Sequence, residues 1–223
     1  MPRTDEHPPD RPISVHGDGT AGIALLWHGR GPREAYAMAP LADAVAAEGV
    51  RVLAADWDST SPDLGRADLE ASLAFAQGVA GELGIDPGDV VLVGWSLGGT
   101  AALGFALQSP APLRTVLVAP GYADRALDAF SGRPLPQTFP PGRGTVDVLW
   151  GSRDELVDET MATSLVERLR TAGWTVSAAE LDADHSGVVG SRFDEATNRY
   201  VSDPGAAGAV ATVASTIVRA ATS

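Results

Sequence analysis

The chain has 223 residues, of which 44% are hydrophobic, and a formal net charge of −13 at pH 7. This length suits one globular domain, and the negative charge argues against nucleic acid or an anionic membrane surface as a partner. The sequence contains no cysteine, and its sixteen basic residues are all arginine. Disulfides, thiolate metal sites, a cysteine nucleophile and a Schiff-base lysine are therefore excluded.

The chain begins with a polar segment that contains four prolines. We expect residues 1–12 to be a disordered tail and residues 13–223 to form a single domain. The first residues lack the apolar core of a signal peptide, and no apolar run approaches the length of a membrane-spanning helix. We therefore expect a cytoplasmic protein, monomeric or homodimeric, without a membrane partner.

Apolar runs alternate with helical patterns along the rest of the chain. Strands are predicted at 13–16, 21–27, 50–57, 90–93, 113–119, 145–150 and 174–181. Helices are predicted at 33–48, 63–84, 100–107, 158–172 and 204–221, with Pro40 indicating a break in the first helix or a later start. This alternation predicts an α/β fold with a mainly parallel central sheet and helices on both faces.

Two irregular stretches interrupt this pattern. Residues 120–144 are rich in proline and glycine, and we expect them to form a short lid-like loop over the carboxyl edge of the sheet. Residues 188–203 form an extra polar loop that is a second candidate cover for the site. No large cap domain is expected.

The central strand leads directly into the run Gly94-Trp95-Ser96-Leu97-Gly98, which has the pattern G-x-S-x-G. A serine between glycines on a sharp strand-to-helix turn projects its hydroxyl, and the helix N–H groups face the place where an anion would form. This pattern predicts that Ser96 is a nucleophile. The alternative is that the Ser96 side chain only caps the following helix.

Three further polar positions follow strand ends, where parallel sheets bind their ligands: His28, Asp154 and His185. A serine nucleophile needs a base, and the base needs a carboxylate that fixes its tautomer. We expect His185 to be the base and Asp154 the acid. Asp158 is the first rival for the acid, although it better fits the start of the next helix, and Asp124 is the second.

Two backbone N–H groups, those of Leu97 and Arg30, are the candidate oxyanion-hole donors. The Arg30 side chain is expected to be solvated, or else to meet an acidic group on the substrate. His28 and Gly29 are weaker substrate-binding candidates, and the expected main role of His28 is structural. Several aromatic residues could line an apolar pocket, of which we select only Trp95; the others are Trp57, Tyr122, Phe130 and Phe139.

Together, four motifs resemble those of a small α/β-hydrolase of the esterase, thioesterase and dienelactone-hydrolase-like kind. They are His28-Gly29-Arg30-Gly31, Gly94-Trp95-Ser96-Leu97-Gly98-Gly99, Gly151-Ser152-Arg153-Asp154 and Asp184-His185-Ser186-Gly187, within residues 21–220. The chain order of serine, aspartate and histidine is also that of this fold. One departure is that dienelactone hydrolases proper carry a cysteine nucleophile, where this chain has Ser96.

The resemblance implies a serine esterase that cleaves a small-molecule carboxylic ester through an acyl-enzyme, with no metal and no organic cofactor. A thioesterase, an acyltransferase or a peptidase would use the same triad, and the sequence does not separate these. A non-catalytic binding protein of the same fold is the alternative from another class. The intact set of Ser96, Asp154 and His185 argues against it.

Overall fold

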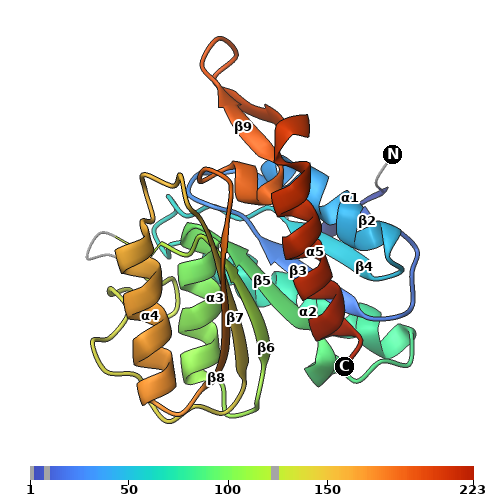
Figure 1. Cartoon of the computed structure of the whole chain (residues 1–223). Helices are drawn as coiled ribbons and strands as arrows, with labels where there is room; N and C mark the ends of the chain where they lie inside the picture. The colour runs from blue at the N-terminus through green and yellow to red at the C-terminus, as the bar shows by residue number, and fades with distance from the viewer. Residues whose placement is uncertain (1–2, 8–10, 122–125) are drawn as a thin grey trace.

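The computed structural model of the chain describes residues 3–7, 11–121 and 126–223 (Figure 1). Its eight-stranded sheet has the order β1-β2-β4-β3-β5-β6-β7-β8. The strands are β1 (Arg3–His7), β2 (Arg11–His16), β3 (Ile23–Trp27), β4 (Arg51–Ala55), β5 (Val91–Trp95), β6 (Arg114–Val118), β7 (Thr145–Gly151) and β8 (Thr175–Leu181). Strands β3 to β8 are parallel, whereas β1 and β2 pair antiparallel at one edge. The predicted mainly parallel sheet is confirmed.

Helices cover both faces of this sheet. The α-helices are α1 (Ala39–Ala47), α2 (Arg66–Glu82), α3 (Leu97–Gln108), α4 (Glu159–Thr171) and α5 (Ala207–Ala221). Helices α1 and α5 share one hydrophobic core with the sheet, and α2, α3 and α4 share the other. Every residue of β3 and β5 is buried, which explains why these strands read as unbroken apolar runs. None of the helices in the described part of the chain has the length and apolarity that spanning a bilayer requires.

The start of the chain differs from its prediction. Within residues 1–12, which were expected to be a disordered tail, Arg3–His7 forms β1 and residues 11 and 12 begin β2. The Pro12 carbonyl accepts a hydrogen bond from the Asp56 N–H (3.1 Å), which ties β2 to the end of β4. Proline is tolerated here because Pro12 stands near the start of β2, before the ladder with β4 begins at Ile13. Polar composition alone therefore concealed an edge hairpin.

Two predicted helix starts are confirmed in detail. Helix α1 begins at Ala39, after a 3-10 turn at Ala35–Met38, so that Pro40 stands in its first turn, where a missing N–H costs nothing. The Asp158 carboxylate caps α4 by accepting from the Met161 N–H (2.8 Å).

The stretch 188–203 is not a loop. It contains the antiparallel hairpin of β9 (Ser191–Asp194) and β10 (Arg199–Ser202), which stands out from the body beyond the carboxyl edge of the sheet (Figure 1). Asn198 turns the chain between the strands with a φ of 53°, a conformation that asparagine tolerates.

The stretch 120–144 also differs from its prediction where it is described. The Asp128 carboxylate packs so closely on Gly104, in the third turn of α3, that a side chain at Gly104 would overlap it. Further along, the Trp174 indole N–H donates to the Pro140 carbonyl (3.1 Å). Residues 126–144 therefore cover the layer of helices α3 and α4, and not the carboxyl edge of the sheet. The proline and glycine content indicated irregular structure correctly, but contained no information on where it packs.

Candidate active site

Ser96 lies at the sharp turn between β5 and α3, at the carboxyl edge of the sheet. Its backbone has φ 54° and ψ −120°, which is a strained conformation for a residue with a side chain. The Ser96 N–H donates to the Val118 carbonyl (3.0 Å), and the Ser96 carbonyl accepts from the Gly121 N–H (2.9 Å). The Ser96 side chain makes no capping hydrogen bond to α3. The helix-cap interpretation of Ser96 is therefore wrong.

Close packing of backbone brings the end of β3 to this turn. A Cβ atom at Gly98 would overlap the carbonyl oxygens of Trp27 and His28. A Cβ atom at Gly29 would lie 3.3 Å from the Cβ of Ser96. The segment that follows β3 therefore lies directly beside Ser96, and at Gly98 only glycine permits so close an approach.

His185 and Asp154 are hydrogen-bonded to each other, 2.7 Å apart from Nδ1 to Oδ2. The Asp154 side chain is 0% exposed and that of His185 is 14% exposed. The second carboxylate oxygen of Asp154 accepts from the N–H groups of Leu156 and Val157, both at 2.8 Å. A carboxylate held in this way fixes the tautomer with the proton on Nδ1 and leaves Nε2 free to act as a base.

Hydrogen bonds within the loop that carries His185 stabilise its conformation. The Asp184 carboxylate accepts from the N–H groups of Ser186 (3.1 Å) and Gly187 (2.7 Å). Trp95, the neighbour of Ser96 in the chain, donates its indole N–H to the His185 carbonyl (2.8 Å). Ser96 and His185 are thus linked through a single residue.

Leu97 and Arg30, the predicted oxyanion donors, both lie near Ser96. Leu97 is the first residue of α3, so its N–H is one of those that have no acceptor within the helix. Arg30 follows Gly29, which lies against Ser96, and its side chain is exposed. The next residue, Gly31, donates its N–H to the Ser59 hydroxyl (2.9 Å), which holds this loop against the loop that follows β4.

His28 has a structural role and not a substrate-binding one. Its side chain is fully buried, with Nδ1 donating to the Gly29 carbonyl (2.8 Å) and Nε2 accepting from the Trp57 N–H (3.1 Å). The Trp57 indole N–H donates in return to the His28 carbonyl (3.1 Å). Burial lowers the pKa of His28 to about 4, so the imidazole is neutral at pH 7. The prediction that His28 binds substrate is wrong, because no part of its ring is accessible.

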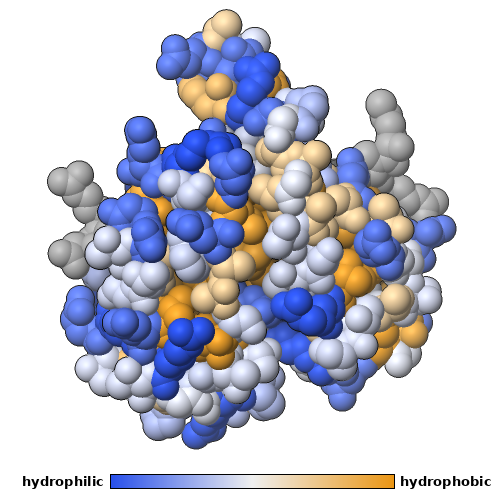
Figure 2. Space-filling view, in the orientation of Figure 1, coloured by the Kyte–Doolittle hydropathy of each residue, from blue (hydrophilic) through white to orange (hydrophobic). Residues whose placement is uncertain are grey.

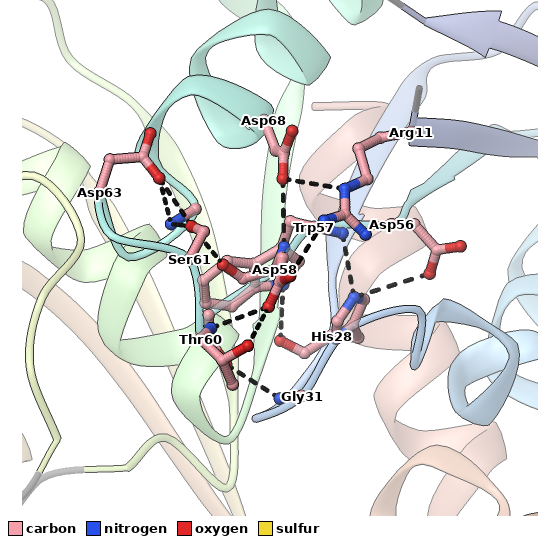
Figure 3. A network of polar contacts seen from close by, with 12 residues as sticks. Arg11, His28, Gly31, Asp56, Trp57, Asp58, Thr60, Ser61, Asp63 and Asp68 are labelled. Atoms are coloured by element: carbon pink, nitrogen blue, oxygen red, sulfur yellow. Dashed lines mark hydrogen bonds and ion pairs between the residues drawn. The ribbon is translucent and has the colours of Figure 1, made fainter. Parts of the chain in front are cut away.

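An acidic loop lies beside this histidine and is connected to β2 through Arg11 (Figure 3). Arg11 of β2 forms ion pairs with Asp58 (3.0 Å) and Asp68 (3.4 Å). Hydrogen bonds from Thr60 lower the pKa of Asp58, whereas burial raises the pKa values of Asp56 and Asp68. One guanidinium therefore offsets several carboxylates behind the candidate oxyanion loop.

Trp95 is buried, with 2% of its surface exposed. Its indole contacts the His185 ring, with centroids 5.5 Å apart, and the Tyr200 ring, with centroids 5.4 Å apart. The prediction that Trp95 lines an acyl pocket is therefore wrong, because its ring is buried against His185 and Tyr200. The sequence analysis missed Tyr200, whose place in a polar stretch concealed its packing.

The other aromatic candidates separate into two groups. Trp57 and Phe139 are buried in the core, and Phe130 stacks on the Trp27 ring with centroids 6.1 Å apart. Tyr122 lies outside the described residues.

Among the rival candidates for the acid, Asp158 serves as the α4 cap, and Asp124 falls outside the described part of the chain.

Comparisons with known proteins agree with this fold. No curated protein matches the sequence. Among solved structures, a bacterial heroin esterase has a TM-score of 0.73 at 20% identity, covering 100% of this chain and 85% of its own. The esterase Est22 with p-nitrophenol has a TM-score of 0.70 at 16% identity, covering 100% and 80%. Carboxyl esterase 2 of the mycorrhizal fungus Tuber melanosporum has a TM-score of 0.69 at 13% identity, covering 99% and 85%.

At these identities, the three structures show the fold. The sequence itself matches the model of the alpha/beta hydrolase family over residues 15–220. This match includes all four motifs that follow the strand ends. The chain therefore belongs to the alpha/beta hydrolase family.

Proposed function

We propose that this protein is a serine esterase, with Ser96 as the nucleophile, His185 as the general base and Asp154 as the residue that orients it. The observation that carries the proposal is the 2.7 Å hydrogen bond between His185 and Asp154 at the sheet edge where Ser96 occupies a strained turn. Strained backbone at a serine is costly to fold and is typical of sites where the side chain must be presented to a substrate.

The reaction follows from these roles. The Ser96 hydroxyl attacks the ester carbonyl carbon while His185 Nε2 takes its proton. The N–H groups of Leu97 and Arg30 stabilise the negative oxygen that forms. The tetrahedral intermediate then expels the alcohol, which takes the proton from His185, and leaves an acyl group on Ser96. Water, deprotonated by the same imidazole, attacks this acyl group, and Ser96 regains its proton as the acid departs.

Asp154 supports this cycle electrostatically. Its carboxylate is buried, but two backbone N–H groups and the imidazole donate hydrogen bonds to it. It therefore stabilises the imidazolium that His185 becomes in each transition state.

The proposed substrate is a small carboxylic ester. All three solved structures compared above are esterases by name, and one of them was solved with p-nitrophenol. A cytoplasmic location, a single domain and a monomeric or homodimeric state belong to the same proposal. Cell fractionation and the mass measured in solution test the first and the last of these.

The test is hydrolysis of p-nitrophenyl acetate by Ser96→Ala. Turnover should fall at least 10⁴-fold, to the level that the rest of the site supports. Ser109→Ala is the matched control, because Ser109 follows α3 at its other end and its hydroxyl hydrogen-bonds with the backbone of Ala111. Unchanged hydrolysis by folded Ser96→Ala would refute the proposal.

A further inference from the structure

A row of aromatic rings connects the β9–β10 hairpin to His185. Phe193 contacts Tyr200 edge-on, with ring centroids 5.4 Å apart. Tyr200 contacts Trp95 in the same manner at 5.4 Å, and Trp95 packs on the His185 ring at 5.5 Å. Both T-shaped contacts have the geometry that aromatic quadrupoles favour. The hairpin therefore reaches the candidate base through a continuous series of contacts.

Trp95 is the central member of this row. It is the last residue of β5 and precedes Ser96 directly. Its indole N–H holds the His185 carbonyl at 2.8 Å while its ring contacts the imidazole. The orientation of this one side chain thus affects both the backbone and the ring of His185.

The hairpin is fixed where it joins the body and exposed at its outer end. The Tyr200 N–H donates to the Tyr36 hydroxyl (3.4 Å), and the Arg199 guanidinium lies 4.7 Å from the centre of the Tyr36 ring. The buried Ser191 donates its hydroxyl to the Ala37 carbonyl (2.6 Å). Phe193, farther out, is 49% exposed. In Figure 2 the protruding hairpin is mainly hydrophilic and carries a small apolar patch.

Tyr200 is the hairpin residue that contacts Trp95. It is half-buried, and burial raises the pKa of its hydroxyl, which is therefore neutral at pH 7. Its ring contributes packing, while no hydrogen bond to Trp95 involves the hydroxyl among the described contacts. The contact can therefore be removed without removing a charge.

We propose that Tyr200 is a positioning residue for the general base: its ring holds the Trp95 indole in the one orientation that places His185 between Asp154 and Ser96. This inference rests on the proposed esterase function. The Trp95 indole contacts both the His185 ring and the Tyr200 ring. Without the Tyr200 ring, a cavity forms beside the indole, and the indole gains room to turn away from the His185 carbonyl.

The kinetic consequence concerns the chemical steps and not substrate binding. A base displaced by a fraction of an ångström transfers protons more slowly in both acylation and deacylation. For Tyr200→Ala we expect kcat to fall about 10-fold to 100-fold, with KM within about twofold of the wild type. Tyr200→Phe keeps the ring and should retain wild-type kcat.

A control variant separates this effect from general damage to the hairpin. Arg192→Ala changes an exposed side chain of β9 and should leave kcat and KM unchanged for an uncharged ester. The melting temperature of each variant reports whether the fold is intact. If folded Tyr200→Ala turns over at the wild-type rate, or if Arg192→Ala loses as much activity, the positioning role is refuted.

A spectroscopic readout makes the inference independent of turnover. The imidazole proton shared between His185 Nδ1 and Asp154 gives a strongly downfield proton resonance, which His185→Gln should remove and thereby assign. We expect this resonance to persist in Tyr200→Phe and to broaden or shift in Tyr200→Ala. A wild-type protein that shows the resonance but cleaves no ester would refute the esterase proposal alone. An unchanged resonance in Tyr200→Ala would refute the positioning role alone.

Discussion

Asp154 contacts His185 with one carboxylate oxygen and holds the N–H groups of the following loop with the other, all at 2.7–2.8 Å. The pair occupies the ends of two neighbouring parallel strands, β7 and β8. One side chain therefore orders both the loop after β7 and the imidazole. This dual role favours Asp154 as the proposed acid over Asp158, which is engaged in capping α4.

Asp154→Asn should reduce kcat by about 10³- to 10⁴-fold at pH 7. An amide at this position can donate to Nδ1 and so favours the wrong tautomer, in which Nε2 carries the proton and cannot act as a base. Steady-state kinetics with p-nitrophenyl acetate measure the loss. Asp158→Asn is the control, with kcat unchanged; equal losses in both variants would contradict the assignment of the acid.

Ser59→Ala removes the acceptor for the Gly31 N–H, a bond of 2.9 Å that fixes the loop containing Arg30. Because one oxyanion donor then becomes less well placed, we expect kcat to fall about tenfold with little change in KM. Ser61→Ala is the matched variant, since Ser61 lies in the same loop but bonds to Asp58, Asp63 and Gly65. Ser61→Ala should lower the free energy of unfolding and leave kcat unchanged. A full kcat in folded Ser59→Ala would show that this bond does not position the donor.

The buried His28 predicts how stability depends on pH. Its pKa is about 4 in the folded protein and about 6.5 when unfolded. The unfolded state therefore binds more protons between these values. The contribution of neutral His28 to the free energy of unfolding is complete above pH 6.5 and is lost as the pH falls toward 4. The loss at pH 5 is about 2 kcal/mol relative to pH 7.

Urea unfolding of the wild type and His28→Gln at pH 7 and pH 5 isolates this effect. The glutamine can accept from the Trp57 N–H, which His28 Nε2 does in the wild type, but does not titrate. The free energy of unfolding of the variant should therefore vary less over this range. The same pH dependence in both proteins would mean that His28 is not held neutral.

Much of the fold and site was predictable because local chemistry determined it. The apolar runs of β3 and β5 are unbroken since both sheet faces are covered. The polar residues that follow strands β5, β7 and β8 contain the candidate triad, since parallel strands end at one edge of the sheet. What the sequence concealed depends on packing between distant segments. Tyr200 appeared to be in a polar loop, and Trp95 was misplaced in an acyl pocket because its partner was unknown.

Alanine substitutions at two glycines test the packing that brings β3 to the Ser96 turn. A side chain at Gly98 would overlap the backbone oxygens of Trp27 and His28, so Gly98→Ala should lower the free energy of unfolding by about 3 kcal/mol or more. Gly78 in α2 is exposed and has open space around its missing side chain. There, Gly78→Ala should raise the free energy of unfolding by about 0.5–1 kcal/mol. Chemical denaturation measures both, and equal effects would contradict the close approach.

The most direct test of the central claim is the site of covalent labelling by a fluorophosphonate. Such a reagent reacts with a serine only where a base and an oxyanion hole activate it. Peptide mapping by mass spectrometry should find the adduct on Ser96 in the wild type, and His185→Ala should prevent it. An adduct on another serine, or none on Ser96 in folded protein that cleaves esters, would contradict the account.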